Sequence, residues 1–588
     1  MTDPNETGQV KLNPEDDGHL DVSRAGFSHL KDAIRAPGLT VDPAEIDRSV
    51  ADVRKRLAVF FYKQDIPCLW ISFVGGTGTG KSTLFNAFCG ISLSETGVER
   101  PKTGGPIAYT HESCQVEHGF PFPDVVMDRP GKAEAAPERS LGRPGHLTVF
   151  THHRAGWSHL IILDTPDLDS VETENLASVE AFYLLSDVIV FVASQDKYAD
   201  DVPYQFLLKI SEDQIPCFLL VNKTHDITKG EILSPLQGQG TVFPENRVWL
   251  IGYQISRDEE SISADPGFSS FVQALLGVVS PDRAKAFHRQ EQARRARALS
   301  NKIERLSELI QRERHEAQRW LAELNHLFED SCAELIKAEK RRFTAESRQH
   351  LQSEIRKLFQ RYDPLSGPRK LIRQILSAPF QVIGISLGRR PNHRKSGLSR
   401  VRQKVDLTPV LGTIERFNRS VLETLSPQRK ESAFSRMLHK PDMALTEAEI
   451  RAAMLKEHDK LDQWLEKKFN DLSRGLPRHK RWGIYSTSIL WGTLILSFEI
   501  VVGGGFSGLD AVLDSVLAPF ITKGSMELFA YREIKAVAKE LAQEYQQALR
   551  SVVKRQKERY EKALLDFLTE AEDLETLREL RKRLQHFT

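Results

Sequence analysis

The sequence predicts an α/β domain with a mostly parallel sheet, followed by a long α-helical bundle or coiled-coil region. Two observations support this fold class. Between residue 68 and about residue 280, short apolar stretches alternate with helix-length segments, as they do in parallel sheets covered by helices. From about residue 283, charged, helix-favouring sequence carries apolar residues at helical spacing almost to the end. We therefore expect three parts: a polar, partly disordered N-terminus at 1–41, an α/β domain with a leading helix at 42–282, and a helical stalk or bundle at 283–588.

Composition limits the class of protein. With 588 residues, 27% charged and 40% hydrophobic, the chain resembles an ordinary soluble protein of two to four domains. The net charge of +1 gives no indication of nucleic acid as a partner. The five cysteines form no C-x-x-C pair, which argues for a reducing compartment and against a disulfide framework or a zinc site. The polar, acidic start lacks a signal-peptide pattern, so we expect a cytoplasmic protein.

The elements of the α/β domain are predicted in chain order. A helix should begin at Asp42, which can cap it, with Pro43 at its first position and apolar residues at helical spacing up to Phe60. Apolar runs predict strands at 68–74, 159–163, 188–193, 217–221 and 248–251, with helices at 173–185 and 202–210 between them. The long stretch 105–157 should hold extra strands or an ordered insertion, for example at 146–152.

Residues 75–82 read Gly-Gly-Thr-Gly-Thr-Gly-Lys-Ser and match the phosphate-binding pattern G-x-x-x-x-G-K-[ST]. The motif lies between an apolar strand and a helix start, which is the context that its chemistry requires. Its glycines let backbone N–H groups converge on phosphate oxygens, and the helix N-terminus adds partial positive charge. Lys81 should reach the β- and γ-phosphates, and the Ser82 hydroxyl should bind Mg²⁺. The domain is therefore predicted to be a P-loop NTPase.

Three further stretches narrow the nucleotide. Asp164 ends an apolar strand, where a carboxylate can hold Mg²⁺ through water. Asn222-Lys223 and Asp226 follow a later strand, and an aspartate there can accept hydrogen bonds from the N1–H and N2–H₂ of guanine, which adenine lacks. Thr103 lies in the loop after the first helix and can reach Mg²⁺ and the γ-phosphate when that loop closes, with Thr110 as a competing candidate.

Taken in this order, these motifs resemble a translation-factor-class P-loop GTPase (G domain) of the Era-like or dynamin-like kind, over about residues 65–260. The run Gly80-Lys-Ser-Thr-Leu-Phe-Asn-Ala-Phe-Cys-Gly90 is similar to the G-K-S-T-L-x-N-A-L-x-G of those families. The resemblance implies GTP as substrate, Mg²⁺ as cofactor and a homodimer through the G domain. It also implies roles for single residues. Phosphate would be bound by Gly75, Gly76, Thr77, Gly78, Thr79, Gly80, Lys81, Ser82 and Thr83. Lys81 and Thr103 would be catalytic. Mg²⁺ would be held by Ser82, Thr103 and the switch II residue Asp164, and guanine would be recognised by Asn222, Lys223 and Asp226.

The sequence departs from the family pattern at four positions. Asp167 replaces the glycine of D-x-x-G, and Leu168 stands where Ras-type enzymes carry the glutamine that orients water. Gly78 stands where dynamins carry a catalytic serine, and His225 occupies the expected position of the guanine-binding aspartate. Two alternatives to a GTPase therefore stay open: a nucleotide-sensing adaptor with little hydrolysis, and an ATP-dependent P-loop protein.

The helical region combines amphipathic helices with two apolar segments. Leu299 to Ile310 and Leu541 to Val552 keep heptad spacing, and Thr446-Glu-Ala-Glu449 is a capping-box helix start. The apolar segments at 371–388 and 482–521 adjoin basic clusters, which suits contact with an anionic membrane lipid surface. Burial of both segments in a helical bundle is the alternative. The favoured function is a Mg²⁺-dependent GTPase that drives movement of a helical, membrane-associated region.

Overall fold

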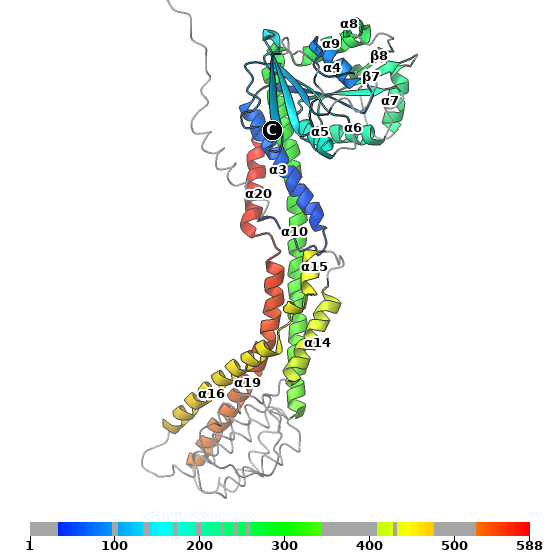
Figure 1. Ribbon diagram of the computed structural model, residues 1–588. Helices are drawn as coiled ribbons and strands as arrows, with labels where there is room; N and C mark the ends of the chain where they lie inside the picture. Colours follow the sequence, from blue (N-terminus) through cyan, green and yellow to red (C-terminus); the bar gives the residue numbers. More distant parts are fainter. Residues whose placement is uncertain are drawn as a thin grey trace, which may run out of the picture. The chain divides into compact units, whose positions relative to one another are not determined.

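The structure is a computed structural model of the 588-residue chain. It describes residues 33–96, 104–132, 140, 142–168, 173–195, 201–225, 227–238, 244–253, 259–342, 408–426, 432–474 and 525–587. These residues fall into two compact units (Figure 1). Of the described residues, the first unit contains those within 33–34, 44–309 and 569–587, and the second contains those within 35–43 and 310–568. The domain boundaries predicted at 41/42 and 282/283 remain predictions.

The first unit is built on an eight-stranded sheet in the order β3-β4-β2-β5-β1-β6-β7-β8. The strands are β1 (Leu69–Gly75), β2 (Ile107–His111), β3 (Val126–Lys132), β4 (His146–His152), β5 (Leu160–Asp164), β6 (Val188–Ser194), β7 (Cys217–Thr224) and β8 (Val248–Gly252). All neighbouring strands are parallel except β2 and β5, which are antiparallel. The predicted α/β fold with a mostly parallel sheet is confirmed, and the stretch 105–157 supplies three extra strands.

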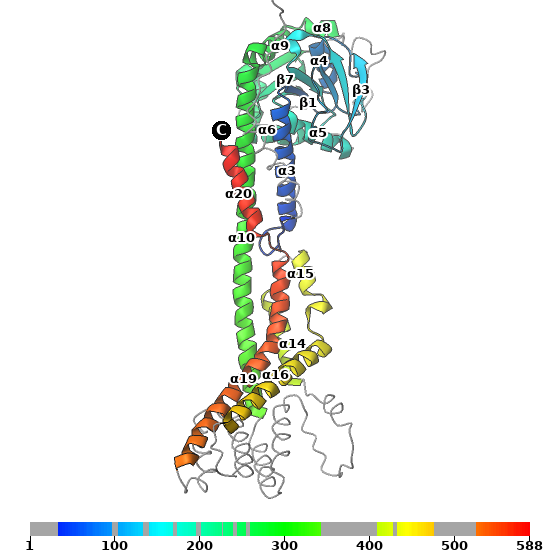
Figure 2. The same ribbon diagram turned by 90° about the vertical axis from the view of Figure 1, so that its left-hand side faces the viewer.

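Helices cover both faces of this sheet (Figures 1 and 2). One face packs on α4 (Lys81–Cys89), α8 (Glu259–Ser263) and α9 (Pro266–Val278). The other packs on α3 (Pro43–Asp65), α5 (Thr173–Leu185) and α6 (Asp201–Glu212). Alternate residues of β1 show why: Leu69, Ile71 and Phe73 face the first group, whereas Trp70 and Val74 face the second. Strands buried on both faces read as continuous apolar runs, which is why the sequence located them well.

The remaining elements of the first unit are α7 (Lys229–Gly238), α20 (Ala571–Gln585), the short 3₁₀ helices η2 (Ala155–Trp157) and η3 (Glu245–Arg247), and the first part of α10 (Pro281–Arg342). The Asp265 carboxylate caps α9 by accepting from the backbone N–H groups of Gly267 and Phe268. Because parallel strands end at one edge, the loops after β1, β5, β6, β7 and β8 gather at the carboxyl edge of the sheet.

The second unit is helical and has a core of its own. It contains the rest of α10 with α14 (Thr408–Thr424), α15 (Ala433–Leu438), η5 (Pro441–Met443), α16 (Glu447–Arg474) and α19 (Ser525–Leu565). Apolar residues of these helices form one cluster, in which the predicted stripe from Leu541 to Val552 is buried. The predicted capping box is present, with the backbone N–H of Thr446 donating to Glu449 and that of Glu449 donating back to the Thr446 hydroxyl.

Among the described helices, none combines the length and the apolar character needed to span a bilayer. The apolar segments predicted at 371–388 and 482–521 lie outside the described residues.

Candidate functional site

The P-loop forms the turn from β1 into α4. Gly75 ends β1, Gly76 to Gly80 make the loop, and Lys81, Ser82 and Thr83 open α4. Gly78 and Gly80 have φ of 74° and 90°, in the left-handed region where a side chain is strained. A Cβ on Gly75 would lie 2.2 Å from the carbonyl oxygen of Val192 on β6. The backbone path of the loop therefore requires glycine at positions 75, 78 and 80.

Two side chains from β7 brace this loop. The Asn222 amide donates to the carbonyl of Thr79 at 2.9 Å, and the Lys223 ammonium donates to the carbonyl of Gly78 at 2.6 Å. A bulge between Val221 and Thr224, opposite β8, and a left-handed φ of 58° at Lys223 turn both side chains toward the loop. The structure thus brings the predicted Asn-Lys pair together with the predicted phosphate loop.

Lys81 is buried against two carboxylates. Its Nζ lies 3.3 Å from Asp164 Oδ1 and 3.4 Å from Asp167 Oδ1, with only 2% of its side chain exposed. Burial by itself lowers the pKa of a lysine, but here the attraction of Asp164 and Asp167 outweighs burial and the pKa of Lys81 is raised. The Lys81 ammonium is therefore charged, and in this structure its counter-ions are two carboxylates. A bound phosphate would compete with these carboxylates for the ammonium.

Asp164 is positioned by a residue that sequence reasoning missed. The hydroxyl of Ser94 donates to Asp164 Oδ2 at 2.8 Å, and both residues are fully buried. Ser94 is in turn fixed by Asn86 of α4, whose side chain accepts from the backbone N–H of Ser94 and donates to its carbonyl. The only sequence signal for this contact was Asn86 itself, which belongs to the run that resembles the Era-like and dynamin-like families.

The residues around Asp164 fit a bound Mg²⁺. Within the described part of the chain, Asp164 Oδ1 is a buried oxygen without a hydrogen-bond partner, and the Lys81 ammonium lies 3.3 Å from it. A carboxylate oxygen of this kind is a ligand suited to a hard divalent cation, directly or through water. Asp164, together with the predicted hydroxyl ligand Ser82 in the first turn of α4, forms a donor set consistent with the metal.

The start of the predicted switch II segment is anchored to β1. The backbone N–H and the hydroxyl of Thr165 both donate to the carbonyl of Phe73, and the N–H of Leu168 donates to the carbonyl of Gly75 at 3.2 Å. The Leu168 side chain is buried in the apolar cluster beneath the sheet. Leu168 therefore contributes packing where Ras-type enzymes place a polar side chain.

Three side chains lie together after β6, β7 and β8, next to the Asn222-Lys223 pair. The Gln195 side chain accepts from the backbone N–H of His225, and the rings of His225 and Tyr253 lie 4.9 Å apart. The Tyr253 side chain is 46% exposed. This is the edge of the sheet where a nucleotide base would lie. The predicted residues Asp226 and Thr103 fall outside the described residues.

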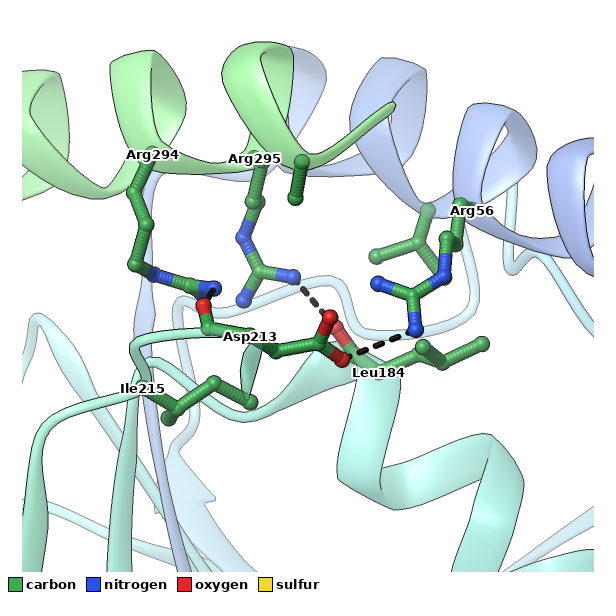
Figure 3. Close-up of a pocket in the computed structure, with 8 residues that line it drawn as sticks. Arg56, Leu184, Asp213, Ile215, Arg294 and Arg295 are labelled. Atoms are coloured by element: carbon green, nitrogen blue, oxygen red, sulfur yellow. Dashed lines mark hydrogen bonds and ion pairs between the residues drawn. The ribbon is translucent and has the colours of Figure 1, made fainter. Parts of the chain in front are cut away.

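A second arrangement links the helix after switch II to α10. Arg295 of α10 donates to the carbonyls of Leu184, Leu185 and Ser186 at the end of α5, and its Nη2 lies 3.0 Å from Asp187 Oδ1. Figure 3 shows Arg294 and Arg295 pointing from α10 into a small pocket beside the end of α5. A cation at a helix C-terminus is favourable because it meets the unsatisfied carbonyls and the negative end of the helix dipole.

Asp187, two residues after the end of α5, is fully buried between two cations. It pairs with Arg295 and with Lys63 of α3, and its second oxygen also accepts from the backbone N–H of Trp70 at 2.8 Å. Burial by itself raises the pKa of a carboxyl, but Lys63 and Arg295 outweigh burial and lower the pKa of Asp187 to about 2. Asp213 makes a similar contact nearby, accepting from Arg56 of α3 at 2.8 Å (Figure 3). Two helices outside the sheet, α3 and α10, are thus fastened to the ends of α5 and α6.

Comparison with known proteins agrees with this geometry. Residues 70–223 match the family model of the 50S ribosome-binding GTPases. With the sheet, the P-loop and the Asn-Lys pair described above, this match defines the segment as a P-loop GTPase domain.

Individual proteins are similar at lower levels. The chain is 28% identical over 217 residues to a protein of Caldicellulosiruptor sp. (strain Rt8B.4) named "Uncharacterized protein in xynA 3'region". The matched part is 33% of this chain and 52% of the relative, so the chain spans about half the length of that curated relative.

Solved structures of bacterial dynamins show 12% identity. An oligomerised bacterial dynamin pair, reported as a mechanism for the long-range sensing and tethering of membranes, has a TM-score of 0.39 over 99% of this chain and 97% of its own. The bacterial dynamin GTPase LeoA from ETEC has a TM-score of 0.25 over 95% of this chain and 100% of its own.

Proposed function

We propose that the protein is a Mg²⁺-dependent GTPase that hydrolyses GTP to GDP and phosphate and uses this cycle to move its helical region. The observation that carries the proposal is the brace from Asn222 and Lys223 to the P-loop carbonyls, beside a charged Lys81. The Asn-Lys pair is hydrogen-bonded to the P-loop, so it links a site for the base to the site for the phosphates. The P-loop of an ATPase does not need such a link. Gly75 to Thr83 are proposed to bind the phosphates, with Asn222, Lys223 and Asp226 at the guanine.

The proposed roles in hydrolysis follow from charge. Lys81 is a fixed cation where negative charge develops during phosphoryl transfer, and it acts together with Thr103 of the switch I loop. Mg²⁺, when bound, supplies a further positive charge, with Ser82, Thr103 and Asp164 as its proposed protein ligands. Because Leu168 is buried, the group that orients the attacking water belongs to another part of the site or to a second copy of the chain.

The proposed coupling runs through α5 and α10. In this cycle, loops close around the γ-phosphate and open again on hydrolysis. Their movement shifts the segment that follows Asp164. That segment leads into α5, whose last carbonyls are held by Arg295 of α10. Since α10 continues as one helix from Pro281 to Arg342, a displacement of α5 acts directly on the long helix. We propose a dynamin-like use of this movement, with the apolar segments 371–388 and 482–521 contacting an anionic membrane from the cytoplasmic side and the G domains forming a homodimer.

A specific observation favours a second candidate, a nucleotide-sensing adaptor with little hydrolysis. Asp167 holds Lys81 at 3.4 Å, and Leu168 offers no polar group. Such a site can bind nucleotide and change conformation without rapid turnover. An ATP-dependent protein is the third reading, and it depends on Asp226 having no contact with the base.

Single-turnover hydrolysis of GTP and of ATP, with anionic liposomes, neutral liposomes or none, separates these candidates. A GTPase hydrolyses GTP in preference to ATP, loses activity on Mg²⁺ chelation, and loses nucleotide binding in Lys81→Ala. Preference for ATP would refute the guanine assignment, and absence of turnover with intact GTP binding would establish the adaptor. Pelleting with anionic but not neutral liposomes tests the membrane proposal independently, and light scattering with a GTP analogue tests the homodimer.

A further inference from the structure

Two cysteines far apart in the sequence meet in the first unit. Cys68 lies directly before β1, and Cys114 follows β2, 46 positions further along the chain. Their sulfur atoms are 2.9 Å apart, and neither thiol is in a disulfide. Because β2 runs antiparallel to its neighbour β5, Cys114 and Cys68 share the amino edge of the sheet, opposite the edge that holds the P-loop. The nucleotide site therefore leaves this pair unused.

The two cysteines are held in place by their surroundings. The backbone N–H of Cys114 donates to the carbonyl of His111, and the Lys63 ammonium donates to the carbonyl of Cys68 at 2.7 Å. Cys114 is buried with 5% exposed, while Cys68 is half-buried and gives the pair access to small solutes. A disulfide has an S–S length of about 2.05 Å, so the sulfurs need to close by roughly 0.9 Å from 2.9 Å.

The electrostatics make Cys114 the more acidic thiol of the pair. The hydrogen bond with Cys114 and burial raise the pKa of Cys68. The hydrogen bond with Cys68 outweighs burial and lowers the pKa of Cys114, and the charges of Lys63 and Arg129 lower it further. Cys114 is therefore the nucleophile of the pair, and Cys68 is the cysteine that resolves its oxidised form.

We propose that Cys68 and Cys114 are a redox modification site that forms a reversible intramolecular disulfide when a peroxide reaches the protein. The Cys114 thiolate attacks one oxygen of hydrogen peroxide, the O–O bond breaks, and the departing hydroxide takes a proton to leave water and a sulfenic acid. The Cys68 sulfur then attacks the Cys114 sulfur, and the S–S bond forms as the S–O bond breaks. The leaving hydroxide takes the Cys68 proton as a second water. Two thiols and one peroxide thus give one disulfide and two waters.

The position of the bridge gives it a consequence for the nucleotide site. The chain between Cys68 and Cys114 contains β1, the P-loop, α4 and Ser94, so the disulfide closes a loop around the phosphate-binding elements. A cellular thiol reverses it by exchange. This agrees with the reducing compartment expected from the cysteine content, because disulfides in such compartments are transient and regulatory.

The test treats the reduced full-length protein with hydrogen peroxide under native conditions, then counts thiols after denaturation. The count is expected to fall from five to three. The intact mass should fall by two hydrogen atoms, peptide mapping should find Cys68 joined to Cys114, and dithiothreitol should restore all five thiols. Cys68→Ser and Cys114→Ser should form no intramolecular disulfide. The control Cys332→Ser removes a cysteine of the second unit and should still lose two thiols.

The mapping on the wild-type chain decides the proposal even where a serine variant fails to fold. Oxidation of Cys114 to sulfinic acid with Cys68 still reduced would overturn it. So would a disulfide that joins two chains or any other pair of cysteines, or a thiol count that stays at five.

Discussion

Lys81 of the P-loop and Asp167 of the segment after β5 form an ion pair, with 3.4 Å between Nζ and Oδ1. Asp167 stands where the resembled GTPases carry a glycine whose N–H contacts the γ-phosphate. In this structure the carboxylate instead contacts the lysine that would bind the phosphates, and 17% of its side chain is exposed. A bound nucleotide must therefore share Lys81 with Asp167 or displace the Asp167 carboxylate from it. An acidic group beside the γ-phosphate repels the phosphate and so opposes nucleotide binding.

We predict that Asp167→Asn strengthens GTP binding, on the order of tenfold, because it removes that competing charge at nearly constant volume. Titration with a fluorescent GTP analogue measures the effect. Asp124→Asn, an exposed aspartate in the loop before β3, makes the same change in net charge and should leave the affinity unchanged. Equal or weaker binding by Asp167→Asn would show that this carboxylate turns away from the phosphates or assists them.

The parts of the site that the sequence predicted are those that a local motif determines. The spacing of glycines in 75–82 sets the backbone of the loop, and a strand-end position placed Asp164 and Asn222 at one edge of the sheet. Strand and helix boundaries agreed closely, for example Thr173–Leu185 and His146–His152. The apolar pattern within each of these segments predicts its secondary structure, so no knowledge of distant contacts was needed to locate the segment.

The parts that the sequence missed depend on residues that only the fold brings together. Ser94 reaches Asp164 across 70 positions, and Cys68 reaches Cys114 across 46 positions. Arg295 reaches Asp187 across 108 positions of the chain. Reading the cysteines by their spacing found no C-x-x-C pair, because proximity at the edge of a sheet leaves no trace in local spacing. Buried polar contacts of this kind depend on the tertiary structure, and the periodicity of apolar residues in the sequence does not predict them.

The clamp from Arg295 to the end of α5 should be essential for the stability of the GTPase domain. We predict that Arg295→Met destabilises the domain by about 3–5 kcal/mol, because it removes hydrogen bonds to three carbonyls and leaves Asp187 with one cation fewer in a buried site. Urea denaturation measures this change. Arg297→Met, two residues further along α10 and exposed, should cost less than about 0.5 kcal/mol. A small loss of stability in Arg295→Met would contradict this prediction and would mean that Lys63 alone balances the charge of Asp187.

Glu313 in the second unit accepts five hydrogen bonds from one short segment. Its oxygens lie 2.7–2.9 Å from the backbone nitrogens of residues 38 to 41 and from the Thr40 hydroxyl, and its side chain is 1% exposed. Gly38 has φ of 76°, and a Cβ there would lie 2.8 Å from Pro43 Cγ, so the segment reaches the carboxylate only with glycine at this position.

We predict that Glu313→Gln lowers the free energy of unfolding by about 3 kcal/mol, because an amide presents N–H groups where two or more donors need an acceptor. Thermal and urea unfolding of the full chain measure the loss. Glu316→Gln, on the next turn of the same helix and paired with the exposed Arg319, is the matched control and should change stability by less than about 0.5 kcal/mol. Similar losses in both variants would contradict a special role for the Glu313 contacts.

His152 at the end of β4 should make the stability of the GTPase domain depend on pH. Its ring is 1% exposed, packs 4.4 Å from the Tyr109 ring, and uses Nδ1 to accept from the backbone N–H of Arg154. Burial, with the nearby charges of His111 and Arg154, lowers the pKa of His152 to about 4 from its ordinary value of 6.5.

The folded state therefore binds fewer protons at this site than the unfolded state between pH 6.5 and about 4. Stability is complete above pH 6.5 and falls as the pH drops through that window. We predict that His152→Asn, which keeps an acceptor for Arg154 but cannot titrate, flattens this part of the stability curve relative to wild type. His118→Asn removes an exposed histidine in the loop between β2 and β3 and should leave the slope unchanged. Melting temperatures of the three proteins measured from pH 4 to pH 7.5 test this, and parallel curves for wild type and His152→Asn would refute it.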